Sequence, residues 1–151
     1  MAPDPIVRPA TVADLDALLP LIAEYQRFYG ADPDDGRNRE FFRRFLVPSD
    51  DGVLLGAWDG DVAVGFACVY WTYSSVSAAD VALLNDLLVS STNRSQGVGE
   101  RLVLAVAEAA REHGCVRLEW RTAPDNERAQ RLYDRLDTAK SEWLEYSITL
   151  V

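Results

Sequence analysis

The sequence predicts an α/β fold in which a mixed sheet is flanked by helices. Three observations support this prediction. Strand-like and helix-like hydrophobic patterns alternate along the chain, an Asp-Gly pair separates two long apolar runs, and a glycine stands at each end of one amphipathic run. The chain has 151 residues, of which 48% are hydrophobic, so it can bury one sizeable core. We therefore expect a single domain over residues 1–151.

The first third of the chain is expected to form a strand followed by helices. A strand near residues 6–8 leads to Thr11, a residue type that favours helix N-caps. The helix that follows is expected to be divided by Pro20, with its second part ending at Gly30. Residues 32–36 are expected to form a loop before another short helix. The first helix has an apolar stripe of Leu15, Leu18, Leu19 and Ile22, and the short helix is marked by Phe41, Phe42, Phe45 and Leu46.

The middle of the chain predicts a β-hairpin. Strand-like runs at 53–58 and 62–73 flank Asp59-Gly60, a pair that readily adopts the positive φ angles of a type I′ turn. These two strands are therefore expected to be antiparallel. A third strand ends near Val89. The remaining expected elements are a helix at 97–113, a strand at 116–120, a further helix, and a strand at 143–150.

The most informative stretch joins the strand-like segment at 84–89 to the helix expected at 97–113. Between them stands the run Arg94-Ser95-Gln96-Gly97-Val98-Gly99. Glycines let the backbone approach a ligand, and the first turn of a helix offers unpaired N–H groups and a positive dipole end to an anion. A cofactor that carries a pyrophosphate is therefore implied.

Taken alone, Gly-x-Gly after a strand is also found in ordinary tight turns and helix packing sites. A P-loop would require a longer glycine spacing and a Lys-Ser/Thr pair, which this stretch lacks. A dinucleotide fingerprint would require a third small residue where Leu102 stands. Neither of these phosphate-binding motifs fits.

Arg94-x-x-Gly97-x-Gly99 resembles the acyl-CoA-binding motif of the GNAT superfamily of N-acetyltransferases. A second motif of that family, Asn-x-x-Ala-x-x-Leu-Tyr, is matched downstream in the correct order. Residues 65–73 and 84–89 look like the polyamine-type branch of the superfamily. The resemblance covers nearly the whole chain and implies the GNAT fold, a mostly antiparallel mixed sheet flanked by helices. The second motif consists of Asn126, Ala129, Leu132 and Tyr133.

The resemblance also implies which residues bind acetyl-CoA, the co-substrate. Arg94 would add positive charge or order the loop, and the main-chain amides that follow would hold the pyrophosphate. The pantetheine arm would pair with a strand that splays from its neighbour at a bulge. Asn126 would contact the cofactor, although it can also cap a helix. The amides are those of Gln96, Gly97, Val98, Gly99 and Glu100, and the pantetheine strand is Leu87, Leu88 and Val89.

Two residues are assigned to proton transfer. The family places the tyrosine that Tyr133 matches beside the cofactor sulfur, as general acid, although the apolar stripe around Tyr133 is also typical of a core position. Polyamine-type relatives carry Glu-Asp where this chain has Asn85-Asp86, so Asp86 is the expected general base, directly or through water. Glu24 and Glu119 are alternative bases.

The sequence departs from the family pattern at two positions. Ser95 and Asp137 stand where many relatives have glycine. Ser95 is tolerable where its backbone angles permit, and Asp tolerates the left-handed conformation better than most residues.

Composition narrows the possible partners. The net charge of −9 and pI near 4.5 argue against a nucleic-acid surface and favour cationic substrates. With one His and no Cys/His cluster, no metal site is expected. Cys68 and Cys115 lie in apolar segments and are expected to be buried thiols. No apolar run approaches membrane-spanning length and residues 1–5 lack a signal pattern, so a cytoplasmic protein is expected.

The leading functional hypothesis is an acetyl-CoA-dependent N-acetyltransferase that acts on a primary amine, expected to be a small cationic one, by direct attack in a ternary complex. Tyr70, Trp71 and Tyr73 are candidates to line the amine pocket, or else belong to the core or a dimer surface. A protein or peptide amine is the alternative substrate. A non-catalytic acyl-CoA sensor is the alternative of another class. The resemblance also implies a homodimer in which the C-terminal strand could take part.

Overall fold

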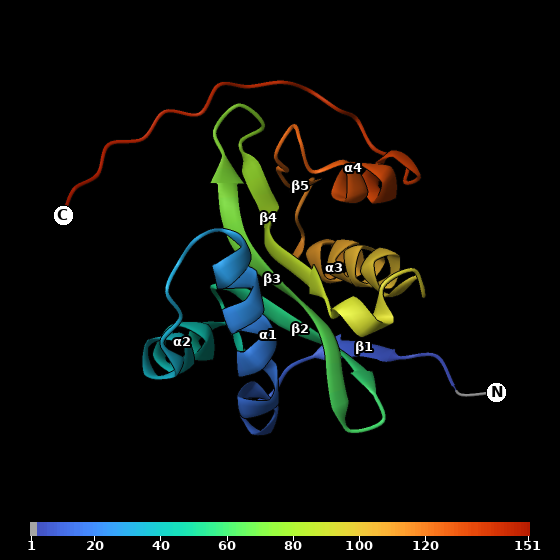
Figure 1. Cartoon of the computed structure of the whole chain (residues 1–151). Coiled ribbons are helices and arrows are strands. Elements are labelled where there is room, and N and C mark those ends of the chain that lie inside the picture. Colours follow the sequence, from blue (N-terminus) through green and yellow to red (C-terminus); the bar gives the residue numbers. More distant parts are fainter. Residues whose placement is uncertain (1–2) are drawn as a thin grey trace. The chain divides into compact units, whose positions relative to one another are not determined.

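A five-stranded sheet with the order β1-β2-β3-β4-β5 organises the first part of the chain (Figure 1). The first four strands are antiparallel to their neighbours, and β5 is parallel to β4. This computed structural model confirms the expected mixed, mostly antiparallel sheet. The strands are β1 (Ile6–Pro9), β2 (Gly52–Asp59), β3 (Val62–Ser74), β4 (Ala79–Val89) and β5 (Leu118–Glu119).

The structure describes residues 3–151, which group into two compact units that meet in sequence between Arg121 and Thr122. The first unit contains the sheet and three α-helices, and the second contains α4. Residues 1–2, part of the segment in which we expected no signal pattern, lie outside the described residues.

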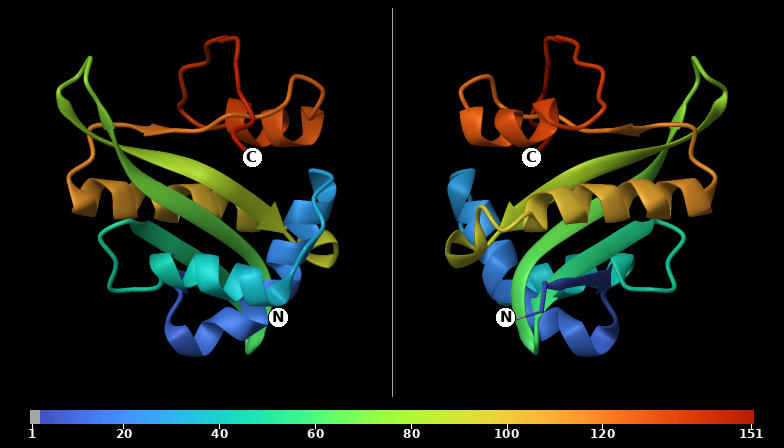
Figure 2. Two further views of the ribbon diagram at one scale, coloured as in Figure 1. Left: turned by 90° about the vertical axis from the view of Figure 1, so that its left-hand side faces the viewer. Right: turned by 90° about the vertical axis from the view of Figure 1, so that its right-hand side faces the viewer.

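Helices cover both faces of the sheet in the first unit (Figure 2). The apolar stripe of α1 (Leu15–Phe28) packs with α2 (Asp35–Phe42) on the face that carries Leu54, Phe66 and Cys68. On the opposite face, α3 (Val98–His113) approaches the strands closely enough for Leu102 to lie near the backbone of β3. The buried residues of α3 are Val98, Leu102, Val103, Val106 and Ala110, which recur at helical spacing.

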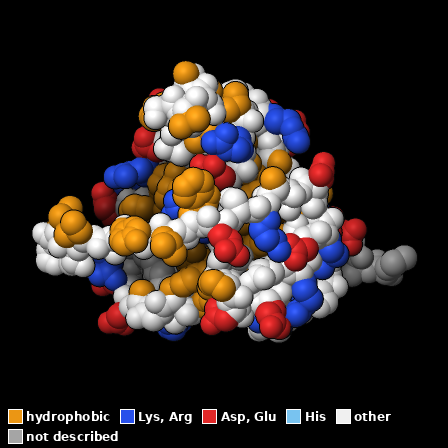
Figure 3. All heavy atoms as spheres, turned by 90° about the horizontal axis from the view of Figure 1, so that it is seen from above, with side chains coloured by type: hydrophobic (Ala, Val, Ile, Leu, Met, Phe, Trp, Pro, Cys, Tyr) orange, Lys and Arg blue, Asp and Glu red, His pale blue; other side chains and the backbone are white. Residues whose placement is uncertain are grey.

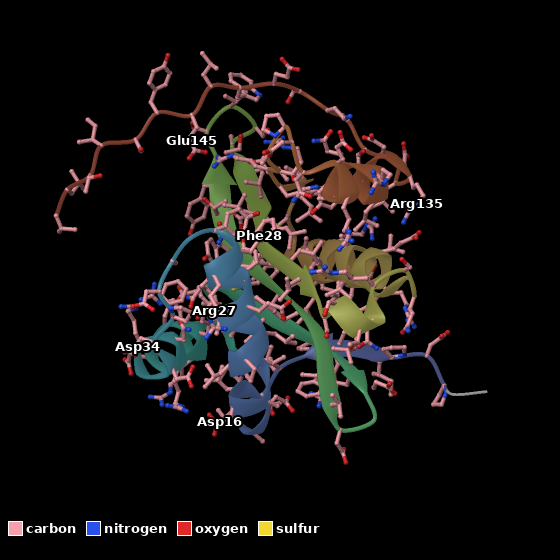
Figure 4. All side chains as sticks on the ribbon, viewed as in Figure 1. Asp16, Arg27, Phe28, Asp34, Arg135 and Glu145 are labelled. Atoms are coloured by element: carbon pink, nitrogen blue, oxygen red, sulfur yellow. The ribbon has the colours of Figure 1, made fainter. Side chains whose placement is uncertain are left out.

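Polar contacts hold α1 and α2 together. Asn38 is 2% exposed, and its side-chain amide exchanges two hydrogen bonds with that of Gln26, at 2.7 and 2.8 Å. Arg39 of α2 donates to Asp16 of α1 at 3.1 Å. Figure 4 shows Asp16 near the start of α1 and Phe28 at its end. Each of the two side-chain amides donates one hydrogen bond to the other and accepts one from it, so both are satisfied where they are buried.

The expectation that Pro20 divides the first helix is wrong, because α1 runs through Pro20 without interruption. Proline in a helix loses one backbone hydrogen bond and costs about 3 kcal/mol. Pro20 is exposed, whereas leucines on both sides of it are buried. Each buried leucine contributes roughly 1.5–3 kcal/mol, so continuing the apolar face outweighs the local cost. The helix ends at Phe28, close to the left-handed Gly30 (φ 77°).

The expected β-hairpin is confirmed, but its turn is not type I′. Asp59 pairs with Val62, so the two central residues of the turn are Gly60 and Asp61. A type I′ turn requires positive φ at both, and of the two only Gly60 has it (φ 61°). Asp59 is used as the last residue of β2, which shifts the turn by one residue.

The two short helical regions begin and end differently from the prediction. The expected loop at 32–36 is shorter, because the Asp34 side chain accepts a hydrogen bond from the Arg37 N–H at 2.7 Å and starts α2 at Asp35. A 3-10 turn at Arg43–Phe45 follows.

The expected helix at 97–113 is confirmed almost to the residue, since Gly97 and Gly114 flank α3 in the left-handed conformation.

The second unit, from Thr122 to Val151, contains α4 (Glu127–Asp134). No strand forms over residues 135–151, so the expected strand at 143–150 is wrong for this structure. The apolar alternation is present, but a strand needs a neighbour to accept and donate its backbone hydrogen bonds. Upstream, the strand expected at 116–120 is reduced to the two residues of β5. The apolar residues left exposed are Trp143, Leu144, Tyr146, Ile148, Leu150 and Val151.

Candidate functional site

The loop between β4 and α3 has two left-handed residues. After a 3-10 turn at Ser91–Asn93, Ser95 has a φ of 68° and Gly97 a φ of 76°. Ser95 therefore adopts the conformation that glycine would supply in many relatives, so its backbone tolerates the substitution. A Cβ on Gly97 would meet no atom within 4 Å, which leaves open space directly above this backbone.

The start of α3 presents unpaired amides. The Arg101 N–H donates to the Gly97 carbonyl at 3.1 Å, which is the first bond of the helix. The amides of Val98, Gly99 and Glu100 precede that bond and therefore lack a carbonyl one turn earlier within the helix. Together with the helix dipole, they favour an anion at this end.

Arg94 orders the loop from the other side. Its Nε donates to the carbonyl of Val89, the last residue of β4, at 3.3 Å. Gln96 is fixed less tightly, because its Oε1 accepts from the Asn93 amide at 3.4 Å. The structure thus places Arg94, Gln96 and the first amides of α3 in one loop-and-helix start.

One edge of β4 is open toward its C-terminal end. The pairing between β4 and β5 covers Ala82 and Leu83 and stops there. The expected pantetheine residues lie beyond that point and pair with β3 on their other edge. Alternate backbone N–H and C=O groups of β4 therefore lack a strand partner in the first unit. These residues are Leu87, Leu88 and Val89, opposite Ala67, Phe66 and Gly65.

The bulge that we expected at these three residues lies further upstream. The register shifts between Cys68, which pairs with Asp86, and Val69, which pairs with Leu84, so Asn85 is the extra residue of β4. The opening beside β4 comes instead from the early end of β5. The prediction of a bulge at 87–89 is therefore wrong in position.

The bulge turns Asp86 toward α1. Asp86 is 4% exposed and pairs with Cys68, whose side chain belongs to the core under α1. The Asn85 side-chain amide donates to Asp86 Oδ1 at 2.8 Å and to the Tyr70 hydroxyl at 3.0 Å. The Tyr25 hydroxyl donates to the Asn85 carbonyl at 3.0 Å. We call Tyr25, Tyr70, Asn85 and Asp86 the β4 polar cluster.

Burial sets the acidity of this cluster. It raises the pKa of Asp86 to about 6, although hydrogen bonding from Tyr25 and Asn85 acts to lower it. Burial, followed by the nearby Asp86 charge, also raises the pKa of the Tyr25 and Tyr70 hydroxyls. A carboxyl group with a pKa near neutrality can exchange a proton at physiological pH, as a general base must.

The alternative bases have different surroundings. Glu119 forms an ion pair with Arg117 on β5, with Nε and Oε2 3.0 Å apart, and its side chain is half exposed. Glu24 is half-buried on α1. Neither side chain is buried as deeply as that of Asp86, which is 4% exposed.

Aromatic rings surround the cluster. Tyr25 packs against Phe66 and Tyr29, and Tyr70 stacks on Phe45 at 5.1 Å between ring centroids. Sequence reasoning had not linked Tyr25 to Asp86. The available signal was its spacing of three residues from the buried Ile22, which places it on the sheet-facing side of α1.

Of the three aromatic residues expected near the amine, only Tyr70 belongs to the cluster. Trp71 alternates to the other face of β3 and stacks on His113 of α3, with ring centroids 4.3 Å apart. Tyr73 has the same alternation as Trp71 and is 82% exposed. Trp71 is half-buried in this contact and does not belong to the buried core.

Two candidate site residues, Asn126 and Tyr133, belong to the N-cap and the body of α4 in the second unit. The Asn126 side chain accepts from the Ala129 N–H at 3.2 Å and so caps the helix, as expected. Tyr133 is half-buried near the helix end, and its carbonyl accepts from the Leu136 N–H at 3.1 Å. Asp137 is not among the described residues with positive φ, so no left-handed residue is used at that position.

Residues 18–137 match the family model described as Acetyltransferase (GNAT) family. The chain belongs to this family. It is 33% identical over 129 residues to the uncharacterized N-acetyltransferase YhfO of Bacillus subtilis (strain 168), covering 85% of this chain and 86% of that protein. The polyamine-type likeness is supported by thialysine N-epsilon-acetyltransferase of Bos taurus, which is 33% identical over 81 residues, 54% of this chain and 47% of that protein.

The fold agrees with that of a solved GNAT-like structure. A crystal structure of a probable acetyltransferase has a TM-score of 0.84 and 30% identity, covering 97% of this chain and 98% of that one.

Within residues 3–151 of the present GNAT chain, no helix has the length and apolar character to cross a membrane. The same residues contain no group of three or more His, Cys, Asp or Glu arranged to hold a metal ion.

Proposed function

We propose that this GNAT enzyme transfers the acetyl group of acetyl-CoA to the primary amine of a small cationic molecule, by direct attack in a ternary complex. The observation that carries the proposal is the buried Asp86 carboxyl, held at a bulge between Tyr25 and Tyr70 and with a pKa of about 6. A group of this kind is suited to take a proton from an ammonium substrate.

The donor would be held by backbone groups on two elements. The unpaired amides of Val98, Gly99 and Glu100, with those of Gln96 and Gly97, would bind the pyrophosphate, and Arg94 supplies a nearby cation. The open edge of β4 at 87–89 would pair with the pantetheine arm. The left-handed Gly97, with open space above it, supports this fit because no side chain blocks the amides.

Proton transfers would be divided between two residues. An amine attacks a thioester only when its lone pair is free, so Asp86 would first accept a proton, directly or through water. Tyr133 would supply a proton to the departing thiolate, and Asn126 would contact the cofactor. The motif match on α4 supports both assignments in the second unit.

The acceptor is inferred from charge and surroundings. Aromatic rings together with a carboxylate are a common environment for an ammonium group, and the net charge of −9 attracts cations. The thialysine relative is named for acetylation of an amine, which supports the same class. A protein or peptide amine is the alternative acceptor, and non-catalytic acyl-CoA binding is the alternative of another class.

We further infer a homodimer and a cytoplasmic location. Figure 3 shows apolar side chains exposed among charged ones on one face of the molecule. The exposed alternating residues of 143–151 would favour a partner surface, since apolar area gains from burial. The two free cysteines, Cys68 and Cys115, are compatible with a reducing compartment. Size determination in solution tests the dimer.

An acceptor screen tests the proposed function. Purified protein is incubated with acetyl-CoA and with polyamines, thialysine and other amino acids, or peptides, and release of free coenzyme A thiol is followed. We expect saturable release with one or more small amines and little with peptides. Preference for peptides would favour the alternative acceptor. Binding of acetyl-CoA without turnover of any amine would favour the sensor.

A further inference from the structure

The bulge in β4 decides which face of the sheet receives Asp86. Leu84 pairs with Val69, which lies on the face of the sheet toward α3. Asp86 pairs with Cys68, which lies on the face toward α1. In a regular strand, residues 84 and 86 would share one face. The extra residue, Asn85, breaks this alternation and turns Asp86 from the α3 face to the α1 face.

The Asn85 side chain uses both donors of its amide nitrogen. One is directed to Asp86 Oδ1 and the other to the Tyr70 hydroxyl, at 2.8 and 3.0 Å. A side-chain amide has two such donors, so its orientation is fixed by two acceptors at once. The opposite orientation would place the amide oxygen against the Asp86 carboxylate, which can only accept when ionised.

The backbone of the same residue is held from α1. The Tyr25 hydroxyl donates to the Asn85 carbonyl at 3.0 Å, and its ring packs against Phe66 of β3. On the other side, the Tyr70 ring stacks on Phe45. Two rings that are themselves packed therefore hold both the main chain and the side chain of the bulged residue.

We infer that Asn85 is a positioning residue for Asp86: it forms the bulge that turns the carboxyl group toward α1 and donates to Oδ1, so that the ionised carboxyl group is held ready to accept the proton of the incoming amine. This inference rests on the proposed role of Asp86 as base. Tyr70 acts through Asn85 by fixing its amide, whereas Tyr25 fixes the Asn85 carbonyl and also hydrogen-bonds Asp86 itself. No bond other than the N–H of the amine and the O–H formed at Asp86 changes in this step.

Asn85 is expected to affect how kcat/KM depends on pH. The Asn85 amide stabilises the ionised carboxylate and so opposes the effect of burial on the pKa of Asp86. Loss of the amide raises that pKa, and the acid limb of the kcat/KM profile moves to higher pH. The titratable and charged groups around Asp86 are Tyr25 of α1, Tyr29 directly after α1, Cys68 and Tyr70 of β3, and Arg44 of the 3-10 turn.

Burial raises the pKa of Tyr25, Cys68 and Tyr70 further above neutrality, which moves their titration away from that of Asp86. A shift of the acid limb therefore reports on Asp86.

The test compares Asn85→Ala and Tyr70→Phe with the wild type and with Tyr73→Phe, a control on the opposite face of β3. For Asn85→Ala we expect the acid limb of kcat/KM to move up by about half to one pH unit, with most of the loss recovered above about pH 8. Tyr70→Phe keeps the ring stacking and is expected to give a smaller shift in the same direction. The double variant is expected to be no worse than Asn85→Ala, because both act through one amide.

Two outcomes overturn the inference. One is an unshifted acid limb in Asn85→Ala. The other is a loss that is equal at every pH, which is the behaviour of a purely structural defect. Where Asn85→Ala does not fold, as judged by coenzyme A binding and thermal unfolding, the same criteria apply to Tyr70→Phe. Asp86→Asn distinguishes failure of the proposed base from failure of the positioning role. Full activity of Asp86→Asn contradicts the proposed base. An inactive Asp86→Asn together with an unshifted acid limb in Asn85→Ala contradicts the positioning role alone.

Discussion

The side-chain amide of Asn85 lies 2.8 Å from the carboxylate of Asp86, although the two residues are consecutive in one strand. Consecutive strand residues normally point to opposite faces of a sheet. The contact is possible because Asn85 is the extra residue of a bulge. In the proposed mechanism, this geometry fixes the buried carboxyl group that accepts the proton of the amine.

Replacing Asp86 by Asn is expected to lower kcat by about 100-fold or more, because a general base contributes roughly 10²–10⁴-fold. The affinity for coenzyme A is expected to stay within about twofold of the wild type, since the assigned donor contacts on the loop, α3, the β4 backbone at 87–89 and Asn126 do not include the Asp86 side chain. Steady-state kinetics and calorimetric titration measure the two quantities. Glu119→Gln is the matched control, and a loss in that variant equal to the loss in Asp86→Asn would contradict the assignment.

The pH profile is expected to follow Asp86. Its carboxyl group must be ionised to act as base, and its pKa is about 6. The value of kcat/KM should therefore fall below about pH 6, tenfold per pH unit well below it. Measurement between pH 5 and 8 tests this, and an acid limb that persists unchanged in Asp86→Asn would assign it to another group.

Stability is expected to vary with pH in the opposite sense to activity. The folded pKa of Asp86, about 6, is above its ordinary value of 3.8, so its contribution to stability is present below pH 4 and lost as pH rises through 6. At pH 7.5 the ionised group costs about 3 kcal/mol. Asp86→Asn should thus be stabilising at pH 7.5 and much less so at pH 5, measured by denaturant unfolding.

The ion pair between Arg8 and Asp14 does not affect this comparison of stabilities between pH 5 and 8. Hydrogen bonding from Arg8 holds the pKa of Asp14 well below its usual range, so Asp14 stays ionised between pH 5 and 8. A stability difference between Asp86→Asn and the wild type that does not change over this interval would show that Asp86 does not titrate there.

Gly97→Glu is expected to raise the KM for acetyl-CoA at least tenfold, because it places a side chain and a negative charge above the amides of α3. The left-handed backbone at Gly97 adds a strain of about 1 kcal/mol for any side chain. Gly114→Glu at the other end of α3 carries the same kind of strain (φ 92°) and the same charge. Equal effects of the two substitutions on KM would contradict the phosphate site.

Tyr133→Phe is expected to lower turnover about tenfold or more and to change the affinity for coenzyme A little. The hydroxyl is the only group removed, so the loss reports on proton donation to the thiolate. Rapid-mixing measurement of thiol release gives the rate of the chemical step. Unchanged turnover would remove Tyr133 from the role of acid.

Local signals predicted much of the fold. Glycines in the left-handed conformation flank α3. These two positions could be predicted because that conformation costs other residues more free energy than it costs glycine. The hairpin followed from two apolar runs around Asp59-Gly60. The turn type was not predictable from that pair alone, because pairing of Asp59 with Val62 moved the turn by one residue.

Features that depend on distant partners were missed or misplaced. A bulge in β4 was expected, but its position at Asn85 is set by the register of β4 against β3, and a slip of one residue leaves no mark in the sequence of either strand. Tyr25 joins Asp86 only because α1 packs across the sheet. The alternation at 143–150 predicts a strand, but a strand also needs an edge to pair with, and residues 122–151 supply none.

Calorimetric titration of the purified protein with acetyl-CoA and coenzyme A tests the central claim most directly. The account predicts saturable binding of one molecule per chain, weakened at least tenfold by Gly97→Glu and preserved in Asp86→Asn. Absence of binding by the wild type to either compound would contradict it.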